Sequence, residues 1–469
     1  MGVYLSRISV TGLFGYLDHE IFLRKDEPTI ITAPNGAGKT HILVLIKATL
    51  SLDLRTLVES PFDTFSVSFS DHVGLIVERE KNSDPSDRCI AVQRVNRNRR
   101  VGPKVVRDRS EIMRLLDGSS RRIVELATGQ WYDREMGRTF SRSFVERRYP
   151  KLVNGIFRKE FEVDAPGIVE ICDRNNVILI DTRRLDAAPP EVLSVSNDDY
   201  NRRAWRTQSA RILQYLDDMT SQVEAARRES IQATQRSDLS FAERALAVAN
   251  VTVHEPDLRS RYSELVSLYE DLAENSLAVG VAPLEFPQKT TPTVRRILKV
   301  FVDDWEKRLE PLVPMNDKIK ALRQIIDSKL GISGKMSSIN ERGSMTFTRT
   351  NSQRDRVRVS SLSSGEQHLV ALFTMLLFAA RENSIVLIDE PEISLHAAWK
   401  HDFLPDITRV SNLMKLQIVL STHSTSIING RWDLTEELRF PEETKVKSAT
   451  DRRGIAASDD ELDEEELDE

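Results

Sequence analysis

Apolar residues recur at two different spacings along the chain, and these spacings predict strands near both ends and helices in the middle. Near the N-terminus, Tyr4–Val10 alternates apolar and polar residues and Glu20–Leu23 follows a glycine-containing turn, which is typical of two antiparallel strands. Thr29–Thr32 is a candidate for a short buried strand, and Ile42–Leu50 for an apolar helix. We expect further strands at Phe65–Ser70, Gly74–Glu78, Ile90–Val95 and Val177–Asp181.

Three segments between residues 201 and 335 repeat apolar residues at helical spacing. The repeating positions are Ile212, Leu216, Met219, Val223 and Ala226 in the first segment, Leu258, Tyr262, Leu265, Leu268 and Leu272 in the second, and Val294, Leu298, Phe301, Trp305, Leu309 and Leu312 in the third. Each stripe spans only about two to three heptads, which favours core helices or a short helical hairpin over a long coiled coil. The preceding segment, from Asn96 to about Phe161, is basic and irregular, and we expect short helices there at 109–117 and 119–128.

Strand and helix patterns return toward the C-terminus. We expect a hairpin at Ser344–Thr350 and Val357–Ser360, a helix at His368–Ala380, a strand at Ile385–Asp389, a helix that ends near Asp402, a strand at Gln417–Leu420 and a loop at Ser421–Ser424. The chain becomes charged after about Asp433, and we expect its end to be disordered.

Composition is that of an ordinary globular protein. Of the 469 residues, 40% are hydrophobic and 29% charged, enough for a large core, and no run approaches the ~18–20 apolar residues that span a bilayer. The N-terminus lacks the layout of a signal peptide, and the Gly2 and Ser6 spacing of a myristoylation site is outweighed by the buried strand predicted there. Cys89 and Cys172 form no disulfide framework. We therefore expect a cytoplasmic protein without a membrane partner.

Charge is distributed unevenly. Residues 459–469 carry nine acidic side chains, so the rest of a chain with net charge −6 sums to +3. Between Arg94 and Glu160 there are 18 basic and 8 acidic residues. The acidic tail is expected to be a solubilising appendage, or alternatively a nucleic-acid mimic that covers the basic segment.

The segment Ala33–Thr40 reads APNGAGKT and fits the phosphate-binding pattern G-x-x-x-x-G-K-[ST], with alanine at the first glycine position. A buried strand precedes it and a helix follows, so backbone N–H groups at the helix start can surround phosphates. Lys39 is expected to reach the β- and γ-phosphates and Thr40 to ligate Mg²⁺. The alanine is tolerable if its φ is negative. The residues assigned to the nucleotide are Asn35, Gly36, Ala37, Gly38, Lys39 and Thr40.

Two acids end the apolar strand Ile385–Asp389. Beside a phosphate loop, Asp389 would hold Mg²⁺ and Glu390 would orient and deprotonate the attacking water. The alternative interpretation of Asp389 and Glu390 is that they are the solvated end of a strand.

His423 follows another predicted buried strand. It is a candidate for a functional residue, and the competing interpretation is a purely structural histidine.

The segment Ser361–Gln367 reads SLSSGEQ and resembles the LSGGQ signature of ABC ATPases, with Ser364 and Glu366 replacing a glycine and the glutamine. The resemblance implies that Ser363, Ser364, Gly365 and Glu366 face the γ-phosphate held by an opposite subunit, and that His423 is the switch histidine. Considered alone, the segment is also adequately explained as a polar N-cap of the helix after it.

The four motifs together resemble the RecF/Rad50/OLD-like (AAA_15/AAA_21) branch of ABC-type ATPases, because Lys39 and Ser363 lie 324 positions apart and His396 replaces the transporter D-loop aspartate. Stand-alone antiphage ATPases such as those of PARIS and Septu look most similar. The implied fold is an α/β ABC-ATPase head, with a mixed central sheet flanked by helices, an antiparallel β subdomain and an inserted helical or short coiled-coil region. In the same family a glutamine, the Q-loop residue, often contacts Mg²⁺ at the position that Arg183 occupies here. The resemblance therefore does not supply this Mg²⁺ contact in the present chain.

We expect the chain to be organised in five parts. These are an N-terminal half-head at 1–95, a basic insertion that ends in a core strand at 96–200, a helical insertion at 201–335, a C-terminal half-head at 336–440 and an acidic tail at 441–469.

The predicted function is that of an ATPase that uses ATP and Mg²⁺, assembles at least as a head-to-tail dimer, and serves as the sensor subunit of an antiphage system. OLD and Gabija nucleases continue into a TOPRIM nuclease, whereas 46 residues follow His423 here, so the effector is expected on another polypeptide, a TOPRIM-like or HNH nuclease. The alternative is a DNA-repair ATPase that binds DNA through Arg94–Lys159 and its aromatic residues. Those aromatic residues are Trp131, Tyr132, Phe140, Phe144 and Tyr149. A transporter ATPase is disfavoured by the motif spacing.

Overall fold

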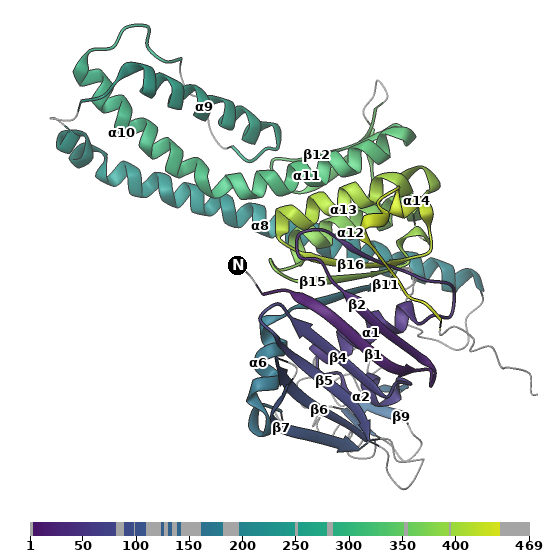
Figure 1. Cartoon of the computed structure of the whole chain (residues 1–469). Coiled ribbons are helices and arrows are strands. Elements are labelled where there is room, and N and C mark those ends of the chain that lie inside the picture. Colours follow the sequence, from purple (N-terminus) through teal and green to yellow (C-terminus); the bar gives the residue numbers. More distant parts are fainter. Residues whose placement is uncertain are drawn as a thin grey trace, which may run out of the picture.

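The computed structural model describes residues 3–80, 89–97, 99–108, 161–181, 197–248, 252–278, 285–350, 355–393 and 395–440, and the short strands 123–125, 130–133 and 138–141. A head of sheets and helices carries a helical arm that projects from one side (Figure 1). The acidic tail and residues 109–117 lie outside the described residues.

The N-terminal part forms a six-stranded antiparallel sheet in the order β2-β1-β4-β5-β6-β7. Its strands are β1 (Leu5–Leu13), β2 (Leu17–Phe22), β4 (Thr64–Phe69), β5 (Val73–Glu80), β6 (Cys89–Asn96) and β7 (Arg99–Asp108). The sequence pattern predicts all of these strands at least in part, except β7. Strand β7 lies at the sheet edge, where most of its side chains are exposed, so its sequence carries no alternating pattern that would predict it.

The central sheet is parallel and has the order β11-β15-β16-β3-β17. Its strands are β3 (Thr29–Thr32), β11 (Val177–Asp181), β15 (Ile385–Asp389), β16 (Gln417–Thr422) and β17 (Thr435–Glu437). Parallel and antiparallel strands therefore lie in separate sheets rather than in one mixed sheet. Ile385 and Leu387 join one hydrophobic core and Val386 and Ile388 the other, since both faces of the sheet are covered.

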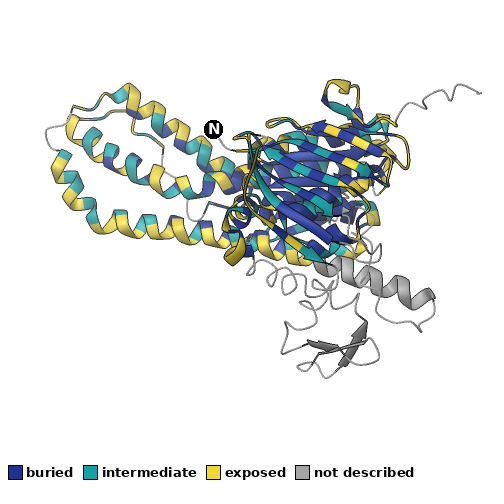
Figure 2. Cartoon of the chain, turned by 60° about the horizontal axis from the view of Figure 1, so that its bottom comes forward, coloured by how far each residue is buried: buried dark blue, intermediate teal, exposed yellow. Residues whose placement is uncertain are grey.

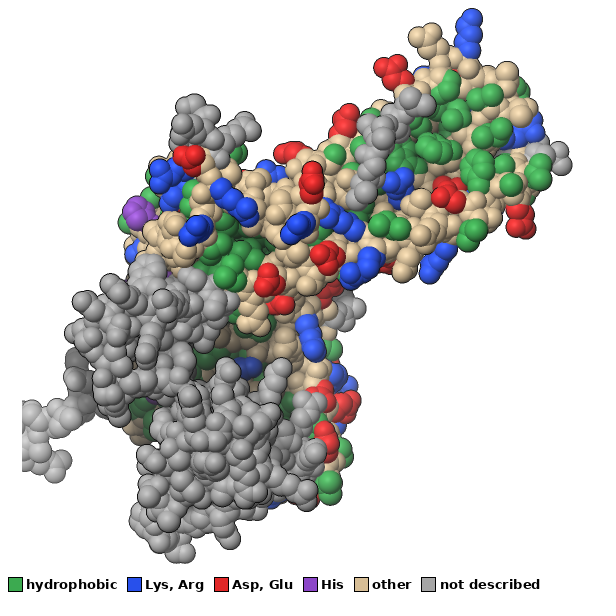
Figure 3. Space-filling model, turned by 180° about the vertical axis from the view of Figure 1, so that it is seen from behind, with side chains coloured by type: hydrophobic (Ala, Val, Ile, Leu, Met, Phe, Trp, Pro, Cys, Tyr) green, Lys and Arg blue, Asp and Glu red, His purple; other side chains and the backbone are tan. Residues whose placement is uncertain are grey.

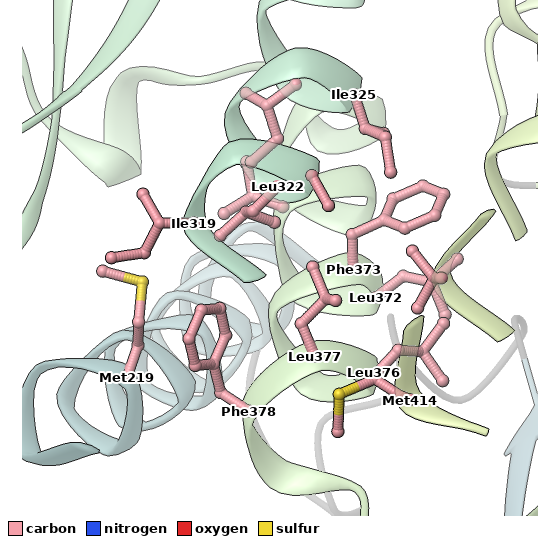
Figure 4. Packing of buried hydrophobic residues seen from close by; sticks show 14 of the residues in the cluster. Met219, Ile319, Leu322, Ile325, Leu372, Phe373, Leu376, Leu377, Phe378 and Met414 are labelled. Atoms are coloured by element: carbon pink, nitrogen blue, oxygen red, sulfur yellow. The ribbon is translucent and has the colours of Figure 1, made fainter. Parts of the chain in front are cut away.

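Helices cover the two faces of the parallel sheet differently. Toward the antiparallel sheet lie α1 (Lys39–Leu50), α2 (Leu54–Glu59) and α6 (Pro166–Arg174). The other face is covered by α12 (Ser364–Thr374), its π-helical extension Met375–Ala379, and α13 (Lys400–Met414). Behind them pack α8 (Asn197–Ala247) and α11 (Val313–Leu330). Figure 4 shows Met219, Leu322, Phe373 and Phe378 in this second core. The expected α/β architecture, a central sheet flanked by helices beside an antiparallel β subdomain, is thus confirmed.

The arm consists of α8 (Asn197–Ala247), α9 (Glu255–Glu274) and α10 (Pro292–Leu309), and a 3₁₀ turn (Glu310–Leu312) connects α10 to α11 (Val313–Leu330). The first apolar stripe is wholly buried, but α8 has 51 residues, far more than predicted. In the third stripe Val294 and Phe301 are exposed, contrary to expectation. Hydrophobic side chains gather on the outer part of the arm (Figure 3), and many residues along the arm helices are exposed or intermediate (Figure 2).

Smaller elements complete the head. A three-stranded sheet contains β12 (Lys335–Ile339), β13 (Met345–Arg349) and β14 (Arg356–Val357), which confirms the first strand of the predicted hairpin and its pairing. The predicted second strand is wrong beyond Val357, because Val359–Ser361 form a 3₁₀ turn. Another three-stranded sheet contains β8 (Ile123–Glu125), β9 (Gln130–Asp133) and β10 (Arg138–Ser141), so the helix predicted at 119–128 is wrong where the structure describes it.

The helix predicted to end near Asp402 is also wrong. Two 3₁₀ turns, Pro391–Ile393 and Ala397–Trp399, occupy that stretch, and α13 begins only at Lys400. The short helix α14 (Thr425–Ile428) follows β16. Within the described residues, no helix is both long and apolar enough to cross a membrane.

Candidate functional site

The predicted phosphate loop lies between β3 and α1, at the carboxyl end of the parallel strands. Gly36 and Gly38 have φ values of 88° and 90°, in the left-handed region that favours glycine. A Cβ on Gly38 would lie 2.4 Å from Leu13 Cδ2, so a side chain has no room there. Ala33 is not among the residues with positive φ, which confirms that alanine can replace the first glycine.

Lys39 is buried at the start of α1, with an exposed fraction of only 5%. Its ammonium donates to the Ala33 carbonyl at 2.8 Å and to the Pro34 carbonyl at 3.5 Å. The described structure gives it no carboxylate partner, and a buried ammonium held only by carbonyls is poorly compensated. Beside the open N–H groups of a helix N-terminus, this arrangement fits an anion such as a phosphate.

His19 braces the same loop from β2. Its Nε2 lies 3.2 Å from the Ala37 carbonyl, which can only accept, so Nε2 carries the proton. Burial lowers the pKa of His19, against smaller opposing effects of the Ala37 hydrogen bond and Asp18, and so favours the neutral imidazole. The sequence pattern does not mark His19 as part of a site, although His19 occupies an inward position between Leu17 and Ile21 in the alternation of β2.

Asp389 connects three chain segments at the end of β15. Thr40 Oγ1 donates to Asp389 Oδ2 at 2.8 Å, and Ser421 Oγ donates to Asp389 Oδ1. Asp389 and Ser421 are register partners of neighbouring parallel strands, so the sheet itself brings them together. Mg²⁺ prefers hard oxygen ligands, and the Thr40 hydroxyl beside the Asp389 carboxylate fits that requirement.

His41 lies beside this carboxylate. Burial lowers the pKa of His41, partly opposed by the negative charge of Asp389. Its ring meets Phe14 edge-on, with centroids 4.8 Å apart.

Glu390 follows directly, with a strained backbone. Its φ is 43°, a left-handed conformation that costs a residue with a side chain about 1–2 kcal/mol. Its N–H donates to the Ser421 carbonyl at 2.9 Å, which holds the loop against β16. Glu390 Oε1 lies 3.8 Å from His423 Nδ1, so the structure brings these two predicted catalytic residues together.

The signature segment caps α12. Ser363 is the N-cap, its Oγ accepting from the Glu366 N–H at 3.4 Å, while the Ser363 N–H donates to Glu366 Oε2 at 2.7 Å. This reciprocal pair is a capping box. Ser363 and Ser364 are exposed and Gly365 half-buried, so the end of the helix is open.

Glu366 differs from expectation, because its carboxylate faces the protein. The residue is 3% exposed, and Lys335 Nζ donates to both of its carboxylate oxygens, at 2.8 and 2.9 Å. Ser333 Oγ donates to Oε1 at 2.7 Å. Burial would raise the pKa of Glu366, but these hydrogen bonds outweigh it and leave the pKa below its ordinary value. The side chain thus organises the signature helix and does not extend toward a nucleotide.

The phosphate loop and the signature belong to helices on opposite faces of the parallel sheet. The buried residues of α1 pack in the core shared with the antiparallel sheet, and those of α12 pack in the core shared with α8, α11 and α13. Helix packing within one chain therefore does not unite Lys39 with Ser363.

Comparison with protein families adds an independent observation. The chain matches the family described as "AAA domain, putative AbiEii toxin, Type IV TA system" over residues 154–429, more than half of its length. The chain belongs to this family. The matched range contains Ser363, Asp389, Glu390 and His423, whereas the phosphate loop lies before it. No curated protein matches the chain.

Two solved structures are similar to this AAA-domain protein over most of its length. One is the Smc head domain with an extended coiled coil bound to the C-terminal domain of ScpA, from Pyrococcus furiosus, with 15% identity, 94% coverage of both chains and a TM-score of 0.33. The other is an SMC head bound to the C-winged helix domain of ScpA, with 12% identity, 91% coverage of both chains and a TM-score of 0.33.

Several predictions for this AAA-domain protein fall outside what the structure describes. Arg183 lies outside the described residues, as do Phe144 and Tyr149, and nothing is described of the side chains of Trp131, Tyr132 and Phe140.

His396, at the position expected for the D-loop aspartate, makes local contacts. Its Nδ1 accepts from the Ala398 N–H at 3.3 Å, and its ring packs on Trp399.

The described beginning of the basic segment makes ion pairs within the chain. Arg100 pairs with Glu78, Lys104 with Glu80, and Arg107 with Asp164. These three cations are therefore already partly neutralised, which weakens this part of the segment as a surface for DNA.

Proposed function

We propose that the chain binds ATP with Mg²⁺ and hydrolyses it at a site completed by a second copy. The hydrogen bond between Thr40 and Asp389 carries this proposal, because it joins the phosphate loop to the acid at the end of β15 across 349 positions. A hydroxyl and a carboxylate in contact, beside a helix N-terminus and a buried lysine, suit a magnesium–phosphate pair.

Each residue has a distinct task in this proposal. The loop N–H groups of residues 35–40 and Lys39 bind the phosphates, and Thr40 and Asp389 hold the ion, whose charge offsets that of the phosphate oxygens. Glu390 accepts the proton of the attacking water. His423, next to Glu390, faces the terminal phosphate.

The second copy supplies Ser363 and Ser364 with the open N-terminus of α12. Support comes from the packing of α1 and α12 on opposite faces of the sheet. In a symmetric dimer, the phosphate loop of each chain lies opposite the signature segment of the other, so two complete sites form.

Variants of Lys39 and Glu390 test the proposed ATPase. Lys39→Ala should abolish ATP binding, whereas Glu390→Gln should bind ATP, lose about 10²–10⁴-fold in kcat and accumulate as an ATP-bound dimer. Glu382→Gln is the matched control, because that glutamate is exposed and pairs with Lys415 before β15 begins. Absence of hydrolysis by the unaltered protein, or full turnover by Glu390→Gln, would refute the proposal.

We further propose that this ATPase controls a separate effector protein, of the TOPRIM-like or HNH nuclease class, in an antiphage system. The family description, which refers to a toxin and a type IV toxin–antitoxin system, supports a paired arrangement. Co-expression with the product of the adjacent gene should give a complex whose nuclease activity changes with the nucleotide bound. Toxicity of this chain alone would instead identify it as the toxic component.

DNA binding separates this role from direct DNA repair. A repair ATPase should bind DNA with an affinity that falls steeply with salt, because affinity from phosphate contacts depends on counterion release. We expect no such binding from the isolated chain.

A further inference from the structure

We infer that Glu392 is a positioning residue that fixes the orientation of the His423 ring; the inference rests on the proposed function and concerns the same site. Glu392 lies two residues after Glu390, in the 3₁₀ turn that follows β15.

Contacts at one carboxylate oxygen support the inference. Glu392 Oε1 accepts from Thr422 Oγ1 at 2.7 Å and from the His423 N–H at 3.2 Å. His423 Nδ1 lies 3.2 Å from the same oxygen, closer than the 3.8 Å to Glu390 Oε1. Thr422 Oγ1 also accepts from the Ser424 N–H at 2.9 Å, so the loop after β16 is tied to Glu392 through its backbone and side chains.

The position of this carboxylate is energetically costly. Its side chain is only 5% exposed, and Oε2 has no hydrogen-bond partner. Among the described residues, His423 is the only basic side chain within ion-pair distance of Glu392. A buried carboxylate with so little compensation usually destabilises a fold, and such costs are concentrated at functional sites.

The geometry selects one ring nitrogen. A carboxylate can only accept, so the neutral His423 ring places its proton on Nδ1, toward Glu392. Nε2 then remains unprotonated on the other side of a half-exposed ring. Glu392 thus decides which ring nitrogen faces the terminal phosphate, in the way that outer carboxylates orient metal-ligating histidines.

A purely structural role is the competing explanation, since Glu392 also anchors Thr422. Two variants separate the roles. Glu392→Met removes the acceptor and keeps the length of the side chain, and its burial is tolerable because an apolar residue replaces a costly charge. Thr422→Val removes the threonine bond to Glu392, together with the acceptor of the Ser424 N–H, and leaves the histidine contact.

The experiment measures the ¹⁵N chemical shifts of labelled histidine in the full chain, together with kcat and the Kd for ATP. We expect an Nδ1–H tautomer of His423 in the unaltered protein and in Thr422→Val. Glu392→Met should shift the ring toward Nε2–H and lower kcat about 10–100-fold, with Kd changed less than about twofold. Compared with Glu392→Met, Glu392→Gln should recover much of the Nδ1–H tautomer and much of kcat, because the amide oxygen of glutamine can accept the hydrogen bonds that the carboxylate accepts.

Two results would overturn the inference. The first is a Glu392→Met variant whose His423 tautomer and kcat are unchanged. The second is a Thr422→Val variant that loses as much kcat as Glu392→Met, which would show that Glu392 acts by anchoring the loop. The ¹⁵N measurement of the tautomer does not require ATP hydrolysis. If the unaltered protein did not hydrolyse ATP, the proposed ATPase function would be refuted, but the effect of Glu392 on the His423 tautomer could still be tested. Glu382→Gln again serves as the control.

Discussion

At the scale of single residues, the candidate site is organised by buried polar groups that meet partners far away in the sequence. Asp389 meets Thr40 and Ser421, and Glu366 meets Lys335. A buried charge stabilises a fold only while its partner is present, and removal of one partner exposes the full cost of burial. The Glu366–Lys335 pair can be tested on this basis.

Lys335→Met should destabilise the protein by about 3–5 kcal/mol, because it leaves the Glu366 carboxylate buried without its cation. Unfolding in urea measures the loss. Adding Glu366→Gln to the same chain should recover much of it, since no charge then remains. A single variant as stable as the unaltered protein would contradict the prediction.

The same pair predicts a dependence of stability on pH. The pKa of Glu366 is lower in the folded than in the unfolded chain, so its contribution is present above the unfolded pKa and is lost as pH falls through the folded pKa. The Lys335→Met variant should show a weaker acid-dependent loss than the unaltered protein. Urea midpoints measured from neutral to acid pH test this, and parallel curves would contradict it.

At the scale of elements, α8 and the α10–α11 pair connect the arm to the head. Gln222 of α8 donates to the Phe378 carbonyl at the end of the π-helical turn. Buried Lys329 of α11 lies between Asp402 and Asp406 of α13, and the 3₁₀ turn after α11 supplies Ser333 to Glu366. The arm is therefore joined to the helix that carries the signature.

The aromatic core of the arm offers a test at this scale. Trp305 packs against Tyr262, Tyr269 and Phe301, with ring centroids 5.5 to 6.2 Å apart. Trp305→Ala should cost the arm about 3–5 kcal/mol through lost burial and a cavity. Hydrogen exchange should rise across α9 and α10 while β3 and β15 stay protected. Equal acceleration in these strands would show that arm and head unfold together.

At the scale of the whole molecule, the proposed site needs two chains. Lys39→Ala and Ser363→Arg should each be inactive as homodimers. In a mixed dimer, one site receives both lesions and the other receives neither, so mixing should restore activity. Analytical ultracentrifugation confirms that the dimers form. Failure to restore hydrolysis in demonstrated mixed dimers would place the site within one chain.

Much of the fold could be predicted because it depends on local patterns. Strands β15 and β16, buried on both faces, are continuous apolar runs, and the first helical stripe is buried throughout. Strand β7 and the turns before α13 could not be predicted, since edge position and long-range packing decide them. Phe301 continues the helical spacing of the buried residues Trp305, Leu309 and Leu312, yet it is exposed.

For the candidate site, the sequence by itself determined the chemistry available: a phosphate loop with glycines at the left-handed positions, two acids after an apolar strand, and a histidine after the next one. These follow from neighbours in the chain, because helix starts and strand ends define where such groups lie. Only the tertiary structure decided that Glu366 faces inward to Lys335, that His19 braces the loop and that Glu392 contacts His423. The physical reason is that burial and pairing of a polar group depend on residues distant in sequence.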